Sequence, residues 1–555
     1  MTEDDREQYP SGGSASVLLV GPYDPHCGEY TFLSPPLGVW RLVGMLRRQG
    51  AHAEVFDPNC CGAEEPERAL ERTLRDRHWD LVGFSTTGMT LRFDLALAHL
   101  TRRLSPASLL VAGGMEATFQ PDLMFELGPF DLVVLGEGER PIAALLERMV
   151  RSEPLDGIAG TVVRQMDGSL VRIPQMALDR DELVESIAAT PYEDMPYERY
   201  WERLEEAYRL DSLPYKAQRE AHLAEIRSVR LITLNYCPMN CTFCSSTNFL
   251  HAAQDSIARV GRLEADEILT MIERIVATQP GVRTIIFQDD IFVFRQDKRI
   301  LPLCDAILEA KASNRIPPGL EFISTNRIDA MTPERLAAMR AAGFRVLGFG
   351  VESFSRPVLE EFNKKQIFPH IDTNLKAALD LGITPFLDLI LTSPRCGLPD
   401  LAESIRRAFR WILAGCEAGM YPYVIPFSGA AMAQDPTLEP HTVYARHRIA
   451  GTTIEWEQPS KILPVDAEVR HAILEIEARF ARALEQLEPS GYHLPSRVRS
   501  LLWVVCATPI LSREGLDVPD IDEALTELRT RLPSELATTV IPPGRPSRAL
   551  ASSSR

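Results

Sequence analysis

Short runs of β-branched and apolar residues alternate with amphipathic stretches between residues 15 and 151. The runs have the length of strands buried on both faces, and the stretches have the spacing of helices that cover such a sheet. This alternation predicts an open, doubly wound α/β domain of the Rossmann-like kind with about five parallel strands. In chain order, the segments are ASVLLVG, GVWRLVGMLRRQG, AEVFD, DLVGFST, the helix at 91–104, SLLVAGG and DLVVLG.

A second alternation of strand and helix patterns occupies residues 227–428. It holds six strand-helix repeats, two fewer than an eight-fold barrel needs, and so predicts a partial (β/α)6 barrel. One helix has clear limits, because Thr332 can cap its start, Pro333 suits its first turn and Gly343 can end it. The predicted strands are RLITLNY, TIIFQ, EFIST, VLGFGVE, FLDLILT and YPYVIPF, and the other predicted helices lie near 264–278, 297–313, 372–382 and 400–414.

The remaining segments have weaker patterns. Residues 152–226 contain a predicted hairpin with Asp167-Gly168 at its turn, followed by a polar, Tyr-rich stretch, and are interpreted as a linker between the domains. Residues 429–535 are predicted to form a mixed, mainly helical C-terminal domain, in which 466–487 is the strongest helix pattern. A flexible leader at 1–14 and a disordered tail at 536–555 are expected.

The composition is that of a multidomain globular protein. The 555 residues exceed what one compact core supports, and 45% hydrophobic with 25% charged residues are ordinary values. No window approaches the ~18 consecutive apolar residues of a membrane span, and the acidic start lacks the features of a secretory signal, so a cytoplasmic protein is expected. A net charge of -18 disfavours a nucleic-acid partner and favours a small-molecule or peptide substrate.

Three cysteines in the spacing CxxxCxxC directly follow the strand RLITLNY, and they are Cys237, Cys241 and Cys244. This end of a barrel strand is where barrel enzymes keep their chemistry. A cubane cluster needs four ligands, so three close thiolates would leave one iron open for an exogenous ligand. The alternatives are a zinc site completed by His251 and a cysteine-rich loop without metal.

The CxxxCxxC spacing, with Phe243 just before the last cysteine, resembles the radical S-adenosylmethionine (SAM) superfamily. Further matches are FQDDIF, STNRID and GFGVESFSRPVLEEFNKK, which follow or include the next three barrel strands. The resemblance implies a [4Fe-4S] cluster on the three cysteines, with the amino and carboxylate groups of SAM on the open iron. One electron, which comes from an external donor, then breaks a carbon-sulfur bond to give a 5'-deoxyadenosyl radical.

The same resemblance implies residues that contact SAM. Asp289 or Asp290 would meet its amino group, and Asn326 or Arg327 its carboxylate. Glu352 and Ser353 would lie beside the cofactor, although Phe354 stands where many family members have glycine. The full predicted set is Phe243, Gln288, Asp289, Asp290, Asn326, Arg327, Glu352 and Ser353.

The first domain resembles the cobalamin-binding domain that precedes the barrel in one large radical SAM subfamily. The resemblance lies in FLSPPLGVWRLVGMLRRQGAHAEVFD, WDLVGFST, LLVAGGMEAT and LVVLGEGERP. It implies that the nucleotide tail of cobalamin is lined by Ser85, Thr86, Gly113, Gly114, Gly136, Glu137 and Gly138. His26 is not expected to bind cobalt, because Asp24-Pro25-His26-Cys27-Gly28 is one residue shorter than the family's Asp-x-His-x-x-Gly. The alternative is a flavodoxin-like domain that binds nothing or mediates assembly.

Together, the two resemblances imply a cobalamin-dependent radical SAM enzyme, and the predicted reaction is methylation of an unactivated carbon. One SAM would make the radical that removes a substrate hydrogen, and another would supply methyl through cobalamin. The alternatives are a cobalamin-dependent radical cyclase, rearrangement or oxidative enzyme without methyl transfer, methylthiolation of RNA, and a non-catalytic redox-sensing or assembly protein with a cluster. The expected partners are the substrate and the electron donor, with no nucleic acid and no membrane.

Overall fold

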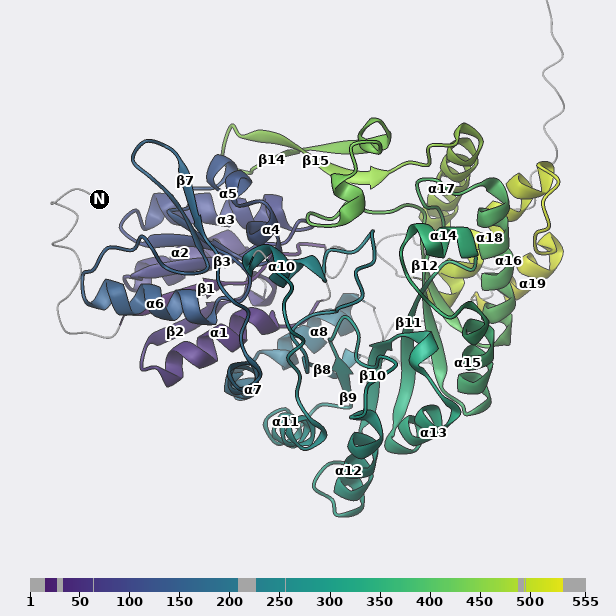
Figure 1. Ribbon diagram of the computed structural model, residues 1–555, viewed down its shortest axis with the longest axis horizontal. Coiled ribbons are helices and arrows are strands. Elements are labelled where there is room, and N and C mark those ends of the chain that lie inside the picture. Colours follow the sequence, from purple (N-terminus) through teal and green to yellow (C-terminus); the bar gives the residue numbers. More distant parts are fainter. Residues whose placement is uncertain are drawn as a thin grey trace, which may run out of the picture.

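The computed structural model describes residues 15–26, 33–62, 64–207, 226–254, 256–487, 494 and 496–532. In these residues the chain forms two large sheets that lie side by side, and a two-stranded hairpin spans the space above them (Figure 1). The predicted leader at 1–14 and tail at 536–555, together with Cys27 and Gly28, lie outside the described residues.

The first sheet has the strand order β2-β1-β3-β4-β5-β6-β7. Its first five strands are parallel, which confirms the predicted doubly wound domain. Along β1, Val17 and Leu19 pack with one set of helices while Leu18 and Val20 pack with the other, as expected for a strand buried on both faces. The strands are β1 (Ser16–Val20), β2 (His52–Phe56), β3 (Leu81–Ser85), β4 (Leu109–Gly113) and β5 (Leu132–Val134). The helices are α1 (Leu37–Arg48) and α6 (Glu139–Val150) on one face, and α2 (Pro66–Asp76), α3 (Leu91–Leu104), α4 (Met115–Phe119) and α5 (Pro121–Leu127) on the other.

The predicted hairpin is present and belongs to this sheet. Strand β6 (Thr161–Arg164) pairs antiparallel with β5, and β7 (Leu170–Ile173) pairs with β6. The first sheet thus extends beyond residue 151, where the linker was predicted to begin. The rest of the linker forms α7 (Arg180–Ala189) and α8 (Tyr197–Ala207), whose apolar side chains pack into the core of the second sheet.

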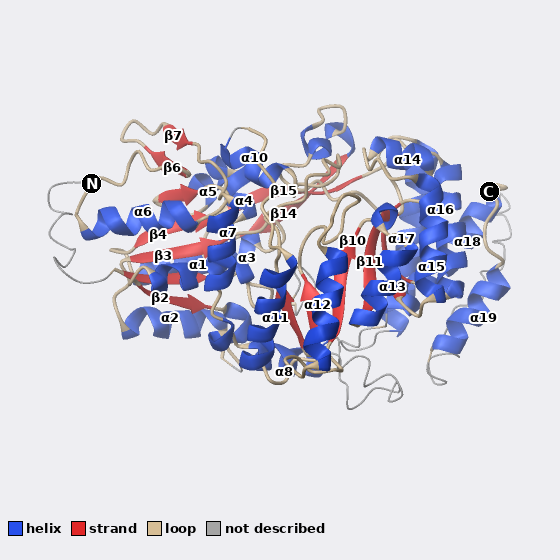
Figure 2. Cartoon of the chain, turned by 60° about the horizontal axis from the view of Figure 1, so that its bottom comes forward, coloured by secondary structure: helices blue, strands red, loops and turns tan. Residues whose placement is uncertain are grey.

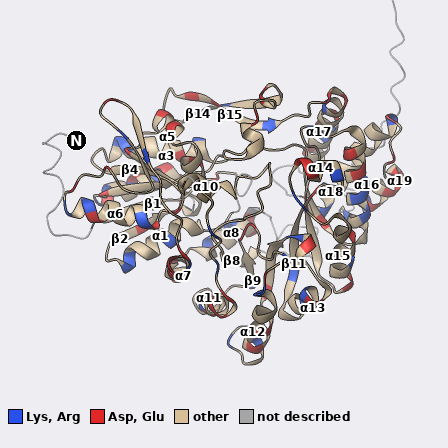
Figure 3. Cartoon of the chain, viewed as in Figure 1, with Lys and Arg blue, Asp and Glu red and all other residues tan. Residues whose placement is uncertain are grey.

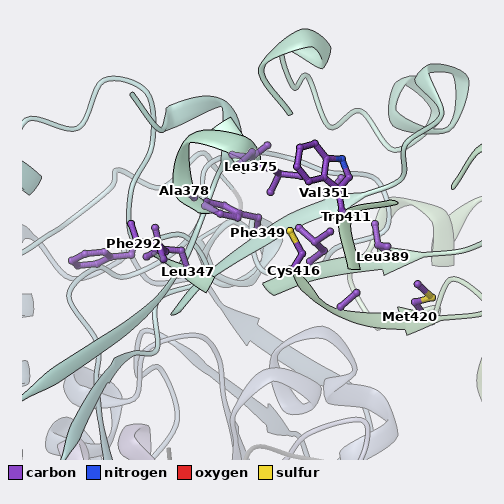
Figure 4. Packing of buried hydrophobic residues seen from close by; sticks show 14 of the residues in the cluster. Phe292, Leu347, Phe349, Val351, Leu375, Ala378, Leu389, Trp411, Cys416 and Met420 are labelled. Atoms are coloured by element: carbon purple, nitrogen blue, oxygen red, sulfur yellow. The ribbon is translucent and has the colours of Figure 1, made fainter. Parts of the chain in front are cut away.

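The second sheet is parallel throughout, with the order β13-β12-β11-β10-β9-β8, and confirms the predicted partial (β/α)6 barrel. Leu347, Phe349 and Val351 of β11 belong to one buried cluster with Leu375, Ala378 and Trp411 (Figure 4). The strands are β8 (Ser228–Leu231), β9 (Thr284–Phe287), β10 (Glu321–Asn326), β11 (Phe344–Glu352), β12 (Thr384–Ile390) and β13 (Glu417–Tyr421). The helices are α10 (Asn248–Gln254), α11 (Ala265–Thr278), α12 (Ile300–Ala312), α13 (Pro333–Ala342), α14 (Arg356–Glu361), α15 (Phe368–Asp380) and α16 (Leu398–Ala414).

The sixth barrel strand differs from its prediction. The segment YPYVIPF was predicted as this strand, but β13 ends at Tyr421, where that segment begins. Pro422 and Pro426 lack the N–H that a ladder needs, so the chain leaves the sheet there. The limits of α13 are as predicted, because the Thr332 hydroxyl accepts a hydrogen bond from the Arg335 amide and Gly343 ends the helix with a φ of +109°.

The C-terminal region forms an antiparallel hairpin and three helices. Strands β14 (Thr442–Arg448) and β15 (Glu455–Ile462) lie over the first domain, whereas α17 (Ala467–Leu487), α18 (Ser496–Arg513) and α19 (Ile521–Arg531) pack at the opposite end of the molecule (Figure 2). Lys and Arg are interspersed with Asp and Glu over both domains (Figure 3). Among the described helices, none is long and apolar enough to cross a membrane.

Candidate active site

The three predicted cluster ligands lie in one loop between β8 and α10. Cys241 is buried, and Cys237 and Cys244 are partly buried. The Cys244 amide donates to the Cys241 carbonyl at 3.2 Å. The Thr247 hydroxyl donates to the Cys237 carbonyl at 2.8 Å and accepts from the Asn240 amide at 3.0 Å. These bonds fold the loop on itself, so that the thiols share one environment and raise one another's pKa.

The environment of these thiols is protein interior. Burial raises the pKa of Cys237 to about 12 and also raises the pKa of Cys241 and Cys244. Thiolates are therefore favoured there only when a bound cation compensates their charge. In the described part of the chain, no group of three or more His, Cys, Asp or Glu side chains is arranged to hold a single metal ion. Three thiols on one loop fit a [4Fe-4S] cluster that leaves one iron for another ligand.

The two aspartates after β9 have different surroundings. Asp289 is buried, and its carboxylate accepts hydrogen bonds from the Thr233 amide and hydroxyl, both at 2.7 Å, and from the Leu234 amide at 3.0 Å. It thereby holds the backbone that leads to the cysteine loop, and burial raises its pKa to about 6. Asp290 is accessible to solvent, but the protein atoms around its carboxyl group raise its pKa. The negative charge of Asp290 in turn raises the pKa of Cys237. Asp290 is therefore near the cysteine loop, while Asp289 holds the backbone before that loop.

Gln288 precedes this pair of aspartates in the chain. Its Oε1 atom is buried and has no hydrogen-bond partner among the described residues. A buried unpaired acceptor is costly, so a ligand that donates to it would be favoured.

Glu352 and Lys364 form a buried ion pair beside the cysteine loop. The Lys364 Nζ atom lies 2.7 Å from Glu352 Oε1, and the two side chains are 11% and 9% exposed. Burial lowers the pKa of Lys364, but the charges of Glu352 and Cys241 and the hydrogen bond to Glu352 together outweigh this effect, so the pKa is raised overall. Glu352 follows a bulge in β11 and has a φ of +61°, a strained conformation of the kind found at functional sites. Lys364 Nζ also lies 5.9 Å from the ring of Phe243, in the cysteine loop.

Arg327 is held by its own neighbourhood. Its Nε and one terminal nitrogen donate to the Asp329 carboxylate at 2.9 and 3.0 Å. The guanidinium also donates to the carbonyls of Lys364 and Lys365, at 3.0 and 3.2 Å. In this structure Arg327 therefore shapes the turn that carries Lys364.

Asn326 and Ser353, two other predicted SAM contacts, also bond within the protein. The Asn326 amide nitrogen donates to the Ser324 carbonyl at 2.9 Å. The Ser353 hydroxyl lies 2.9 Å from the Ser404 hydroxyl of α16. Both side chains are buried and fix the backbone at the ends of β10 and β11.

Asp388 and Tyr421 belong to the same opening and were not predicted. Asp388 lies on β12 opposite Gly419 of β13. Tyr421 follows Gly419 by two residues on the same strand. Burial raises the pKa of Asp388 to about 7, the charge of Glu352 adds to the rise, and Lys364 opposes it. No described side chain forms an ion pair with Asp388. The sequence signal was a lone carboxylate within the apolar run FLDLILT, which suggests a strand position facing the barrel interior.

At the first domain, the loops after β3 and β4 approach each other closely. The Thr86 hydroxyl donates to the Gly113 carbonyl at 2.9 Å and accepts from the Ala117 amide at 3.2 Å. Gly114 has a φ of +92°, and a Cβ there would lie 2.8 Å from the Thr86 carbonyl oxygen. The structure thus brings together Ser85, Thr86, Gly113 and Gly114 at the carboxyl edge of the sheet, where ligands of such sheets bind.

The segment Gly136-Glu137-Gly138 has different neighbours. Gln175 of the linker donates to the Glu137 carbonyl at 2.6 Å, and the Glu137 carboxylate accepts from the Leu178 amide at 2.7 Å. A Cβ on Gly136 would lie 2.6 Å from the Cβ of Ala253 in α10. Gly136 and Glu137 thus contact the linker and the helix that follows the cysteines, whereas a Cβ on Gly138 would meet Leu42 of α1 and Ile142 of α6. That these three residues line the nucleotide tail of cobalamin stays a prediction.

Replacement of Gly136 by alanine is expected to lower the free energy of unfolding by about 1–3 kcal/mol more than replacement of Gly168, which is the matched control. Both glycines have a positive φ, 66° and 85°, but only Gly136 has a close neighbour, because nothing lies within 4 Å of a Cβ on Gly168. Urea unfolding of both variants measures the difference. Equal losses would show that α10 does not press on this loop.

Two protein families match the two domains of the chain. The B12 binding domain family matches residues 25–146, and the Radical SAM superfamily matches residues 231–408. An uncharacterized methyltransferase of Pyrococcus horikoshii is 24% identical over 376 residues, which are 67% of this chain and 69% of that protein.

Two solved structures share the fold over most of their length. The cobalamin-dependent SAM radical enzyme OxsB, with aqua-cobalamin bound, aligns with a TM-score of 0.64 and 15% identity over 95% of this chain and 80% of its own. The radical SAM methyltransferase TsrM of Kitasatospora setae, with tryptophan substrate and a SAM analogue bound, aligns with a TM-score of 0.61 and 15% identity. The alignment covers 90% of this chain and 98% of TsrM. At this identity, the two comparisons show a common fold.

Proposed function

Because the chain is a radical SAM enzyme with a B12-binding domain, we propose that it methylates an unactivated carbon of a small-molecule or peptide substrate. The supporting observation is the direct connection between its two sites. The cysteine loop continues into α10, where Phe249 packs 6.3 Å from Phe119, in the segment after β4. The loops of the two cofactors therefore border one space, which a reaction that uses both cofactors on one substrate requires.

The cofactors of the two domains are a [4Fe-4S] cluster, SAM and cobalamin. When bound, they supply a 5'-deoxyadenosyl radical that removes a substrate hydrogen and a methyl group that replaces it. Cys237, Cys241 and Cys244 would hold the cluster. The chain's other residues have no bond to make or break, so their work is to bind, orient and exclude water.

SAM is proposed to lie between β9 and β12 at the barrel opening. The carboxylate of Asp290 and the unpaired Oε1 of Gln288 can accept from its amino group. Glu352 and Asp388 are carboxylates that can accept from ribose hydroxyls, which donate well to charged acceptors. Lys364 neutralises this group of acids beside the cluster and can face the carboxylate of SAM.

The remaining predicted contacts are proposed to position these groups. Asp289 holds the backbone before the cysteines, and Arg327 holds the turn with Lys364. Asn326 and Ser353 fix the ends of the neighbouring strands. Cobalamin is proposed to bind at the first-domain residues Ser85, Thr86, Gly113 and Gly114, with its reactive face toward the barrel opening.

Product analysis of reduced, iron-loaded protein tests the methyl-transfer proposal. With SAM and cobalamin we expect both 5'-deoxyadenosine and S-adenosylhomocysteine, and omission of cobalamin should remove only the second. Formation of 5'-deoxyadenosine alone under both conditions would favour a radical cyclase or oxidative enzyme. Absence of both products from protein that retains its cluster would favour a redox-sensing or assembly protein.

A further inference from the structure

The chain between β13 and α17 leaves the barrel and returns to the point where it left. Val424 and Ile462 form an antiparallel bridge, in which the Ile462 amide donates to the Val424 carbonyl at 3.0 Å. Residues 424–462, which include the hairpin β14–β15, are called the strap below. Figure 1 shows the strap reaching from the barrel across to the first domain.

The far end of the strap is packed into the first domain. Ile449 and Trp456 are buried in the hydrophobic cluster that also contains Phe84 of β3 and Leu91 of α3. These apolar contacts hold the hairpin in place, because moving it away would return two large side chains to water.

Two hydrogen bonds connect the strap to the loops at the carboxyl edge of the first sheet. The Gln458 side-chain nitrogen donates to the carbonyl of Gly88, after β3, at 2.7 Å. The Ser428 hydroxyl donates to the carboxylate of Glu116, after β4, at 2.9 Å. Glu116 is buried, and the hydroxyl supplies a bond that its carboxylate would otherwise lack.

The near end of the strap contacts the cysteine loop. The Met432 amide donates to the carbonyl of Thr242, which lies between two of the cysteines, at 2.9 Å. The Asn248 side-chain nitrogen of α10 donates to the Gly429 carbonyl at 2.6 Å. One segment therefore bonds to the loop of the cluster and to both loops at the edge of the B12-binding sheet.

We propose that Gln458 and Ser428 are positioning residues for cobalamin. Through Gly88 and Glu116 they hold the loops after β3 and β4 in the conformation that binds the cofactor, and the strap sets the position of these loops relative to the cluster. This inference rests on the proposed placement of cobalamin at the same loops. Neither side chain needs to touch the cofactor. Gln458 is hydrogen-bonded to Gly88 and Ser428 to Glu116, so each acts on the cofactor through a loop residue.

The test is cobalamin binding by the variants Q458E and S428A. Glutamate keeps the size of Gln458 but cannot donate to the Gly88 carbonyl, and its charge would face Glu116, which approaches Gly88 from the same side. Alanine removes the Ser428 hydroxyl. Loss of one hydrogen bond is expected to raise the Kd for cobalamin about three- to tenfold, and the double variant about tenfold or more. Equilibrium dialysis against hydroxocobalamin, followed by visible absorbance, gives the Kd for the iron-loaded protein.

Two further variants separate positioning from a general loss of structure. Glu457 is the neighbour of Gln458 on the outer side of the hairpin, where it is 58% exposed, so E457Q should bind cobalamin like the unaltered protein. S428T keeps the hydroxyl and should restore binding, while iron content should stay constant in all variants. If the double variant fails to fold, the single variants still give the comparison.

Each outcome has a separate meaning. A Kd for Q458E and S428A equal to that of E457Q would overturn the role of the strap and leave the proposed function intact. If the unaltered, iron-loaded protein binds no cobalamin, the proposed function itself fails, and with it the inference.

Discussion

Replacement of Cys241 by alanine is expected to remove the cluster and stop cleavage of SAM. Cys241 is the most buried of the three thiols, and a cluster held by only two thiolates would lose both a ligand and its enclosed position. Iron should fall from about four atoms per chain to less than about one. The formation of 5'-deoxyadenosine should fall to the level of protein without iron. Iron analysis and product chromatography of the anaerobically purified variant measure the two effects.

The matched control is Cys416, a buried free cysteine in the hydrophobic core of the barrel. Its replacement by alanine should leave iron content and SAM cleavage unchanged. Iron retained at the full level after loss of Cys241 would show that this loop does not ligate the cluster.

Replacement of Lys364 by methionine is expected to lower the free energy of unfolding by about 3–5 kcal/mol, because Glu352 would remain charged and buried without its partner. The double variant with Glu352→Gln should recover much of the loss, since it removes the unpaired charge. Urea unfolding of the iron-free protein measures the free energy of unfolding of the single and of the double variant. The affinity for SAM, measured on iron-loaded protein, should fall in the single and the double variant, because neither has the ammonium group beside the cluster.

Lys376 provides the comparison for this ion pair. It lies 2.7 Å from Asp380 in α15, but these side chains are 70% and 60% exposed. Its replacement by methionine should change the free energy of unfolding by less than about 0.5 kcal/mol. A similar change for Lys364 would mean that solvent screens the Glu352 pair as well.

The predicted fold was recovered where the sequence has a clear period. Strands such as FLDLILT and helices with caps, such as the one after Thr332, follow from local pattern, and the parallel direction of the strands follows from their alternation with helices. Helix α18 was missed because it is buried on nearly all sides, so its apolar residues show no helical period. The hairpin β14–β15 is polar on its outer side and depends on contacts with the first domain, which no local pattern reveals.

The candidate site was predictable to the extent that spacing defines it. Three cysteines at CxxxCxxC spacing share one loop in the structure, as their separation in the chain requires. The pairing of Lys364 with Glu352, and the use of Arg327 to hold a turn, depend on how the chain returns at the ends of β10 and β11. The close approach of Gly136 to Ala253 could not be predicted, because Ala253 is distant in sequence.

Metal analysis of the reconstituted protein tests whether one chain holds both metal cofactors. After loading with iron, sulfide and cobalamin and removal of the excess by gel filtration, we expect about four irons and about one cobalt per chain in the same protein peak. Iron without cobalt would contradict a functional B12-binding domain. Zinc in place of iron would contradict the radical SAM site.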